Sequence, residues 1–315
     1  MRQTTPIVEI LEIGGDELER LLAVRNAVWP RDPASAEEYV DWRRQAEDAV
    51  WLLAVEDGVD VGAGVGVHGW HSPPGVGRLE LWVAAAARGR GTGTALLERL
   101  GAWLASRGCS EATAAIVDGD EASAAWAGRR GFVEVGRNSV LALDLADHVR
   151  PEVDAPEGIE IVRWAERPEL APGLYRVYVE AVPDIPGEEE TELPAYEDWL
   201  ENDMRGVSDR PEATFVALAD GDVIGYAKLA IPPGAADVAW HDLTGVLRAW
   251  RGRGVAGALK RAQIAWAAEH GFRWLKTANE ERNEPVRRLN ARHGYRLQPG
   301  VVTVRGPVRL EGTAS

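Results

Sequence analysis

The sequence predicts an α/β protein that contains two tandem domains of the same design. Strand-like runs alternate with amphipathic helices along the whole chain, which is typical of a layered α/β fold. A length of 315 residues suits two domains of about 150 residues each. A strand, a glycine-rich turn and a helix also follow one another twice, with Arg251 standing 163 positions after Arg88.

The 163-residue offset holds well beyond the glycine-rich turns. It relates positions from Gly58 to Phe132 to equivalent positions in the second half. Chance does not keep one register over such a distance, so the chain is an internal duplication. The pairs include Val83 with Val246, Leu96 with Leu259, Trp103 with Trp266, Gly108 with Gly271 and Gly131 with Gly294.

The first copy, residues 1–146, contains local patterns that mark its elements. Ser35-x-x-Glu38 is a capping box, which starts a helix. Asp57-Gly58 between two apolar runs indicates a hairpin turn. We expect strands at 6–13, 50–55, 59–67, 79–83 and 112–117, helices at 16–28, from 35, from the glycine-rich turn to 107 and at 121–130, and then two closing strands.

The second copy, residues 159–315, repeats this plan after a linker at 147–158. The linker is rich in proline and mixed charge, as connecting segments often are. Gly271 is placed to end the helix that follows the second turn. We expect strands at 159–163, 215–219, 223–231, 240–246 and 273–277, and helices at 170–182, from the turn to 271 and at 284–292.

Each glycine-rich turn followed by a helix predicts an anion site. The first helical turn has unpaired N–H groups, and the helix dipole adds partial positive charge. Glycine lets a phosphate approach the backbone, and arginine adds charge. Neither turn contains the Gly-Lys-Ser/Thr of nucleotide loops or the Gly-x-Gly-x-x-Gly of dinucleotide sites. The predicted residues are Arg88, Gly89, Arg90, Gly91, Thr92 and Gly93, and Arg251, Gly252, Arg253, Gly254, Val255 and Ala256.

Two sets of residues carry a family resemblance. Arg88-x-x-Gly91-x-Gly93 and Arg251-x-x-Gly254-x-Ala256 each follow a strand that ends in valine, and Thr277-x-Asn279 leads to Asn283, Asn290 and Gly294-Tyr295. This pattern resembles the Gcn5-related N-acetyltransferases, in two tandem copies that cover nearly the whole chain. The resemblance implies a mixed α/β sheet that splays beside its fourth strand, and acetyl-CoA as cofactor. It also implies that backbone N–H groups near Val246 and Leu247, and near Val83 in the first copy, contact the thioester, and that Asn283 lies near pantetheine.

A base that takes a proton from the amine is expected on the strand before the second turn. The resemblance favours Asp242 and His241 there. Asp242 shares strand parity with Val246, while His241 faces the other way. Asp242 could equally be a strand-end carboxylate, and a hydrogen-bonded structural histidine is the better interpretation of His241. The first copy has Leu79 in place of Asp242, and Glu80 next to it on the opposite parity.

The acid that protonates the leaving thiolate departs from the family pattern. Many relatives have a tyrosine five residues before the aromatic that follows glycine, whereas this chain has Asn290 and, in the first copy, Ala127. Asparagine can hydrogen-bond a thiol but supplies no proton. We therefore expect the second copy to be catalytic, with Asn290 at the thiol, and the first copy to be degenerate.

Charge and composition restrict the partners. The net charge of −15 argues against non-specific nucleic-acid binding. Residues 184–203 contain nine acids and no lysine or arginine, which indicates either a solvated helix face or a funnel for a cationic amine. Clustered histidines and cysteines that could bind a metal are lacking in the sequence, as is an apolar stretch for a signal or a membrane span.

These observations predict a cytoplasmic acetyltransferase, monomeric or homodimeric, that acts on a small cationic amine. The single cysteine suits a reducing compartment. Three alternatives remain open: an enzyme similar to mycothiol synthase, an aminoglycoside-type acetyltransferase, and a non-catalytic acyl-CoA-binding or sensing module.

Overall fold

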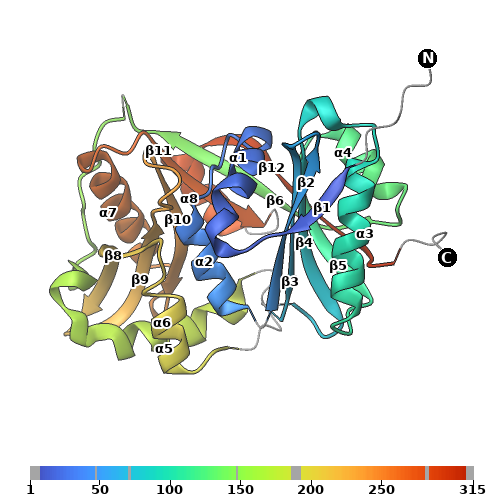
Figure 1. Ribbon diagram of the computed structural model, residues 1–315. Helices are drawn as coiled ribbons and strands as arrows, with labels where there is room; N and C mark the ends of the chain where they lie inside the picture. The colour runs from blue at the N-terminus through green and yellow to red at the C-terminus, as the bar shows by residue number, and fades with distance from the viewer. Residues whose placement is uncertain are drawn as a thin grey trace, which may run out of the picture. The chain divides into compact units, whose positions relative to one another are not determined.

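The computed structural model describes residues 8–46, 48–69, 72–146, 148–185, 193–280 and 284–309. The chain divides into two compact units, and the colours of Figure 1 allow the reader to follow it by residue number. Unit 1 contains Met1–Arg137 and Val301–Ser315, and unit 2 contains Asn138–Gly300. Each unit has a mixed sheet with helices on both faces, which is the α/β architecture that the sequence predicts.

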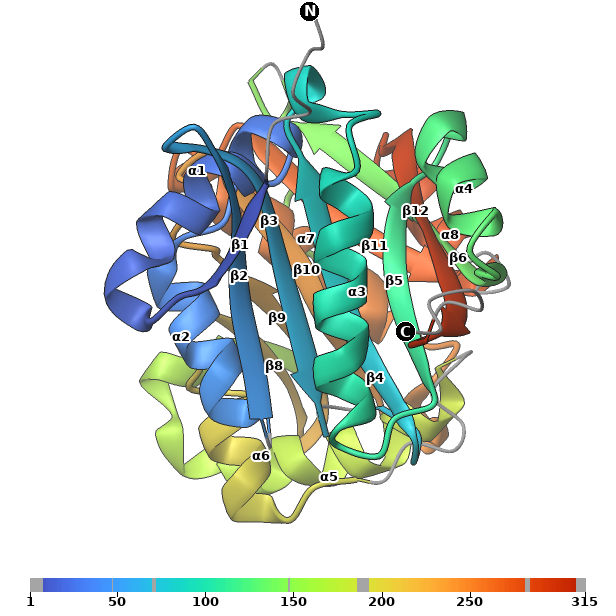
Figure 2. The same ribbon diagram turned by 45° about the vertical axis from the view of Figure 1, so that its right-hand side comes forward.

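The sheet of unit 1 has the strand order β1-β2-β3-β4-β5-β12. One face packs against helices α1 (Leu18–Val28) and α2 (Ala36–Gln45), and the other packs against α3 (Thr92–Ala105) and α4 (Glu121–Gly128). Figure 2 shows α3 lying across the strands. The strands are β1 (Glu9–Glu12), β2 (Asp48–Glu56), β3 (Val59–His68), β4 (Val76–Val83), β5 (Glu111–Val117) and β12 (Arg296–Pro307).

The sheet of unit 2 has the order β6-β11-β10-β9-β8-β7. Helices α5 (Ala171–Ala181) and α6 (Tyr196–Asn202) cover one face, and α7 (Val255–Glu269) covers the other. Helix α8 (Glu284–Arg292) follows β11. The strands are β6 (Val133–Asp144), β7 (Ile159–Arg163), β8 (Asp209–Ala219), β9 (Asp222–Ala230), β10 (Val238–Val246) and β11 (Trp274–Glu280).

Local signals in the sequence act as predicted. The Ser35 hydroxyl accepts from the backbone N–H of Glu38, and the Glu38 carboxylate accepts from the N–H of Ser35, so the capping box is present. The hairpins at Asp57 and Asp220 both turn through positive φ, 50° and 51°, followed in each case by glycine. Equivalent turns at equivalent positions confirm the duplication.

The closing strands differ from the prediction. The first copy ends in one long strand, β6, and not in two. Strand β6 pairs with β11, with Leu143 opposite Leu275, while β5 pairs with β12, with Ile116 opposite Val302. Each copy therefore gives its last strand to the sheet built mainly from the other copy, and the compact units change at Asn138 and not at the predicted linker.

Both sheets open at the same place. Strands β10 and β11 run parallel and pair from Val238 to His241 only, and β4 and β5 pair from Val76 to Arg78 only. Beyond these residues the two strands of each pair separate. The splayed sheet that the family resemblance implies is thus present in both units.

Candidate active site

The two glycine-rich turns have the geometry of an anion site. Gly91 (φ 96°) and Gly254 (φ 85°) are the N-caps of α3 and α7, and neither helix has a side-chain cap. A β-carbon at Gly89, Gly91 or Gly252 would meet nothing within 4 Å, whereas one at Gly254 would lie 3.4 Å from the side chain of Pro156. The first N–H groups of both helices are available to a phosphate.

The arginines of the turns are less free than the sequence suggests. The Arg251 guanidinium lies 2.7 Å from the Asp184 carboxylate, and its Nε donates to the Val246 carbonyl at 3.0 Å. Arg90 pairs with Glu56 at 2.9 Å, and Arg253 lies over the ring of Trp250. Carboxylates thus offset two of the predicted charges, and the backbone N–H groups become the main anion ligands.

The two backbone N–H groups predicted to contact the thioester, those of Val246 and Leu247, point in different directions. The sequence predicts that the N–H of Leu247 contacts the cofactor. In the structure this N–H donates to the Ile224 carbonyl of β9 at 2.9 Å, so it is already used within the sheet. N–H directions alternate along a strand. The N–H of Val246 therefore faces the opening between β10 and β11.

A β-bulge in β10 changes the parity of the predicted base. The register with β9 shifts between His241, opposite Leu229, and Thr244, opposite Ala227. The extra residue turns Asp242 toward the α5 and α6 face, while His241 and Val246 both face α7. The predicted shared parity of Asp242 and Val246 is wrong for this reason.

The bulge also makes Asp242 comparable with Glu80 of the first copy. Strand β4 pairs with β3 without any shift, and Glu80 accepts a hydrogen bond from the Tyr39 hydroxyl of α2 at 3.1 Å. Both carboxylates therefore lie on the face covered by the first two helices of their copy, although their sequence positions have opposite parity. Glu80 is also paired with Arg78 at 2.8 Å.

Asp242 belongs to a buried ion-pair cluster. The Lys228 ammonium lies 2.6 Å from Asp242 and 2.8 Å from Asp209, and it donates to the Asp203 carbonyl. Burial alone would lower the pKa of Lys228, but the charges of Asp242 and Asp209 outweigh it and raise that pKa above its usual range. Lys228 is buried and the Asp209 side chain is 11% exposed, whereas the Asp242 side chain is 46% exposed and open to a ligand.

An aromatic wall stands beside this cluster. The Tyr226 hydroxyl is buried beside the Trp199 indole, and it makes no hydrogen bond of good geometry with the described residues. Burial, and then the charge of Asp242, raise the pKa of Tyr226 well above its usual range. Trp199 lies at the centre of the wall and packs against Tyr175, Tyr178 and Tyr196 with ring centroids 5.3 to 6.0 Å apart.

His241 occupies a second polar cluster on the opposite face. Its Nδ1 lies 2.9 Å from the Gln263 side-chain oxygen, and its Nε2 lies 2.5 Å from the Tyr295 hydroxyl. Burial, and then the charge of Lys260, lower the pKa of His241 well below its usual range. His241 is therefore a neutral, hydrogen-bonded core residue and a poor candidate for the base.

Asn290 is completely buried close to this cluster. Its backbone carbonyl accepts from the N–H of Tyr295 at 3.3 Å, but both polar atoms of its side chain lack a partner among the described residues. A buried amide without partners indicates a site for water or a polar ligand group. Asn283, also predicted at the cofactor, lies outside the described residues.

The two copies differ in the polarity of these positions. Six polar residues of the second copy stand where the first has apolar residues of its core. The fold does not require the polar residues, because the duplicate folds without them. The polar residues Tyr226, Lys228, Lys260, Gln263, Asn290 and Tyr295 correspond to Ala63, Val65, Leu97, Leu100, Ala127 and Phe132.

Lys228, Asp209, Lys260 and Gln263 were not predicted from the sequence. Lys228 stands between apolar residues of β9, and Lys260 and Gln263 stand on the apolar side of α7. A polar residue within an apolar stretch of sequence could have drawn attention to these positions. The sequence does not show which residues contact them, because the contacts come from other strands.

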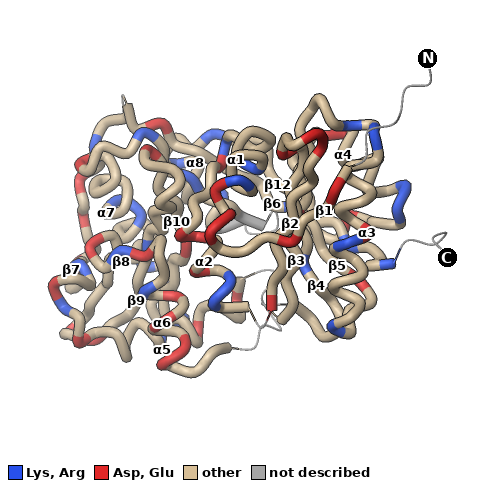
Figure 3. The backbone as a smooth tube through the Cα atoms, in the orientation of Figure 1, with Lys and Arg blue, Asp and Glu red and all other residues tan. Residues whose placement is uncertain are grey.

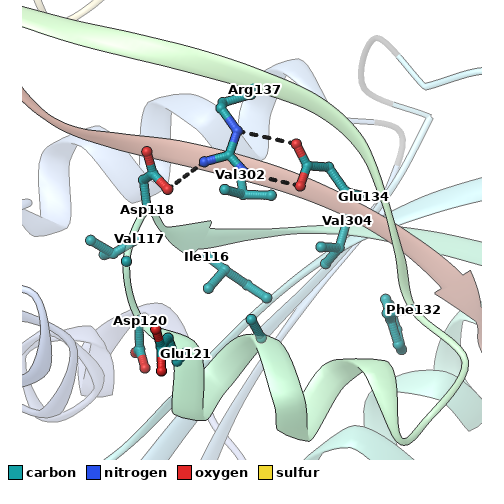
Figure 4. Close-up of a pocket in the computed structure, with 12 residues that line it drawn as sticks. Ile116, Val117, Asp118, Asp120, Glu121, Phe132, Glu134, Arg137, Val302 and Val304 are labelled. Atoms are coloured by element: carbon teal, nitrogen blue, oxygen red, sulfur yellow. Dashed lines mark hydrogen bonds and ion pairs between the residues drawn. The ribbon is translucent and has the colours of Figure 1, made fainter.

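Unit 1 contains a cavity of 340 Å³ next to α4. Figure 4 shows Arg137 between the carboxylates of Asp118 and Glu134, above an apolar floor that includes Ile116 and Val302. Asp120, which takes the place of Asn283 in this copy, accepts from the backbone N–H of Ser123 and caps α4. The excess of carboxylates makes this cavity a poor place for an anionic cofactor.

Charges of both signs are interleaved along the described parts of both units, as Figure 3 shows. Among the described residues, no three histidine, cysteine or acidic side chains are grouped so that they could hold a metal ion. In the same residues, no helix is long and apolar enough to cross a membrane.

Comparisons with known proteins agree with this architecture. Residues 16–132 and 172–295 match the acetyltransferase (GNAT) family. A search among curated proteins found no match. A GCN5-related N-acetyltransferase from Sphaerobacter thermophilus is 22% identical with a TM-score of 0.73, and 96% of each chain is covered.

A tandem GNAT protein from the clavulanic acid biosynthesis pathway is also 22% identical. The TM-score is 0.76, and the match covers 96% of this chain and 99% of the other. These likenesses show the fold. Since the family match takes in most of both copies, the chain belongs to the GNAT family of acetyltransferases, which use acetyl-CoA.

Proposed function

We propose that the second copy transfers an acetyl group from acetyl-CoA to a small cationic amine, with Asp242 as the proton acceptor. The observation that carries this proposal is the cluster of Asp242, Asp209 and Lys228 beside the opening of the sheet. Two carboxylates and one ammonium leave one negative charge, which attracts a protonated amine. The exposed side chain of Asp242 is the member that a substrate can reach.

The residues of the second turn fit the cofactor. The N–H groups at the start of α7, from Val255 and Ala256, would hold the pyrophosphate, because no side chain caps them. The N–H of Val246 would donate to the thioester carbonyl. Acetyl-CoA supplies the activated acyl group, and the protein binds, orients and removes a proton from the amine.

The Lys228 ammonium supports the role of Asp242. Its contact at 2.6 Å holds the Asp242 carboxylate in place, and a carboxylate so placed can accept a proton from the bound ammonium. The Tyr226 hydroxyl could hydrogen-bond the incoming substrate. The wall around Trp199 would receive apolar parts of the same molecule.

The proposed funnel for the amine stays a prediction. Glu188, Glu189 and Glu190 lie outside the described residues. Asp184, at the start of the acidic segment, is paired with Arg248 and Arg251, so its charge is already compensated. The funnel would then depend on the acids that follow Asp184.

The test is acetyl-CoA-dependent release of free thiol with putrescine, spermidine, lysine, glucosamine and kanamycin as amines. Asp242→Asn should lower kcat by on the order of 100-fold with at least one of them, because a general base is lost. Arg273→Met, which removes an exposed charge from the same unit, is the control. Turnover that survives in Asp242→Asn would refute the assignment of the base. Binding of acetyl-CoA without turnover on any amine would favour the sensing module.

A further inference from the structure

The proposed reaction needs a group that protonates the leaving thiolate, and this inference rests on that proposed function. The residue at the position of the family's tyrosine is Asn290, whose amide supplies no proton. Its buried side chain has no partner in the described part of the chain, which indicates that a polar group of a ligand or a water molecule completes it. The proton therefore has to come from water or from another side chain near Asn290.

Lys260 lies in the same cluster. Its ammonium is 4.7 Å from the ring centre of Tyr295, and only 3% of the residue is exposed. None of the described carboxylates pairs with Lys260. A buried lysine without a counter-ion is costly, so its presence needs an explanation beyond folding.

The position of the cluster fits the chemistry. The Tyr295 hydroxyl binds His241, and His241 is the last residue of β10 that pairs with β11. The N–H of Tyr295 donates to the backbone carbonyl of Asn290. These contacts place Lys260, His241 and Asn290 around the point where the sheet opens, which is where the proposed thioester would lie.

The other ionisable groups of the neighbourhood do not fit this role. Both ring nitrogens of His241 are engaged, and burial keeps this histidine neutral. Burial also raises the pKa of Tyr295, whose hydroxyl is already used in its bond to His241. His293, the third titratable group near Lys260, has a pKa lowered by burial and then by the charge of Lys260.

We propose that the ammonium group of Lys260 donates the proton that the departing thiolate takes up. As the carbon–sulfur bond breaks, its electron pair stays on sulfur, an N–H bond of Lys260 breaks and an S–H bond forms. Lys260 is left as a neutral amine and regains its proton from solvent. The substrate nitrogen loses two protons through Asp242 on the other face of β10, one before it attacks and one as it becomes the amide. Since Lys260 takes one proton back from solvent, one net proton is released per turnover.

Two further observations support this assignment. Burial lowers the pKa of Lys260 to about 7. A donor with such a pKa gives its proton readily to a thiolate, whose thiol has a reference pKa of about 8.5. In the first copy the same position is Leu97, inside the apolar core, so the fold itself does not require a lysine here.

The first test needs no amine substrate. The thiol of bound CoA is titrated, and the ultraviolet absorbance of the thiolate reports its ionisation. A nearby ammonium favours the thiolate, and Lys260 keeps part of its charge near pH 7, so the unchanged protein should contain more thiolate than Lys260→Met near neutral pH. Lys276→Met, which removes an ammonium that lies over Trp240, should leave the titration unchanged. Equal titration curves for the unchanged protein and Lys260→Met would overturn the proposal.

Turnover gives a second readout. With an amine that the enzyme accepts, Lys260→Met should lower kcat at pH 7 on the order of 100-fold, with an unchanged Kd for acetyl-CoA by calorimetry. Lys260→Arg keeps the charge but does not release its proton, so it should lower the thiol pKa without restoring turnover. A kcat within threefold of the unchanged protein in either variant would contradict the proposal.

The failure of this inference and the failure of the proposed function look different. If no amine is acetylated, the proposed function fails, while the thiol titration still reports whether Lys260 lies beside the sulfur. If amines are acetylated and Lys260→Met changes neither readout, only the role of Lys260 is wrong.

Discussion

Replacing Lys260 with methionine should stabilise unit 2 in neutral and acidic solution. The pKa of Lys260 is lowered from 10.5 to about 7 by burial. In the unfolded chain the lysine keeps its ordinary pKa, so the unfolded state binds more protons between pH 7 and pH 10.5. Burial of the charged form thus destabilises the folded state. Methionine has a similar length and no charge, and it removes this penalty.

The magnitude follows from the two pKa values. A pKa difference of about 3.5, at about 1.36 kcal/mol per pKa unit, corresponds to about 5 kcal/mol. The penalty is fully present below pH 7, where Lys260 is charged in both states, and it falls to about 2 kcal/mol at pH 9. It vanishes above pH 10.5. The stability of the unchanged protein should therefore rise with pH in this window.

Hydrogen exchange of the amides of α7, followed by mass spectrometry, measures this stability without assuming that both units unfold together. At pH 6 the variant should be more protected than the unchanged protein, and the difference should shrink at pH 9. The comparison is made at each pH between the two proteins, because intrinsic exchange rates depend on pH. A constant difference between pH 6 and pH 9, or less protection in the variant, would refute the view that a desolvated charge sits at this position.

Four further predictions follow from the structure. Gly91→Ala and Gly254→Ala strain equivalent turns, so each should remove binding of acetyl-CoA at its own copy, and the calorimetric stoichiometry should show which copies bind. Glu80→Gln should leave turnover nearly intact, because the first copy lacks the polar residues of the second. Neutralising residues 188–190 should lower kcat/KM for a cationic amine, and raised salt should reduce that loss. Residues 1–146 expressed alone should aggregate or fold poorly, because β5 loses its partner β12, whereas co-expression with the remainder should recover soluble protein.

Local patterns in the sequence determine much of the fold. The capping box at Ser35, the Asp57-Gly58 hairpin and the positive φ of Gly254 depend on neighbouring residues only, so the sequence could predict them. The exchange of β6 and β12 depends on which strand edge is filled by a segment far away in the sequence. The periodicity of the strands contains no information about that choice.

The candidate site shows the same division. The phosphate-binding turns were predictable because strand, glycines and helix are contiguous. The orientation of Asp242 was not predictable. One extra residue in β10 shifts the alternation of the strand, so side chains before the bulge lie on the opposite face from the one that the pattern after it indicates. Lys228 was missed for a related reason, as its carboxylate partners come from β8 and β10.

The duplication explains how the chain can contain a site whose buried polar groups lower its stability. Buried Lys260 alone costs about 5 kcal/mol at neutral pH, a large share of the 5 to 15 kcal/mol that stabilises a typical domain. The buried side chains of Asn290 and Tyr226, which make no hydrogen bond of good geometry with the described residues, add to that cost. The first copy has the same architecture with Leu97, Ala127 and Ala63 at these positions, so it pays none of these terms. A copy that only has to fold can keep an apolar core, and selection for turnover then acts on the polar residues of the other copy.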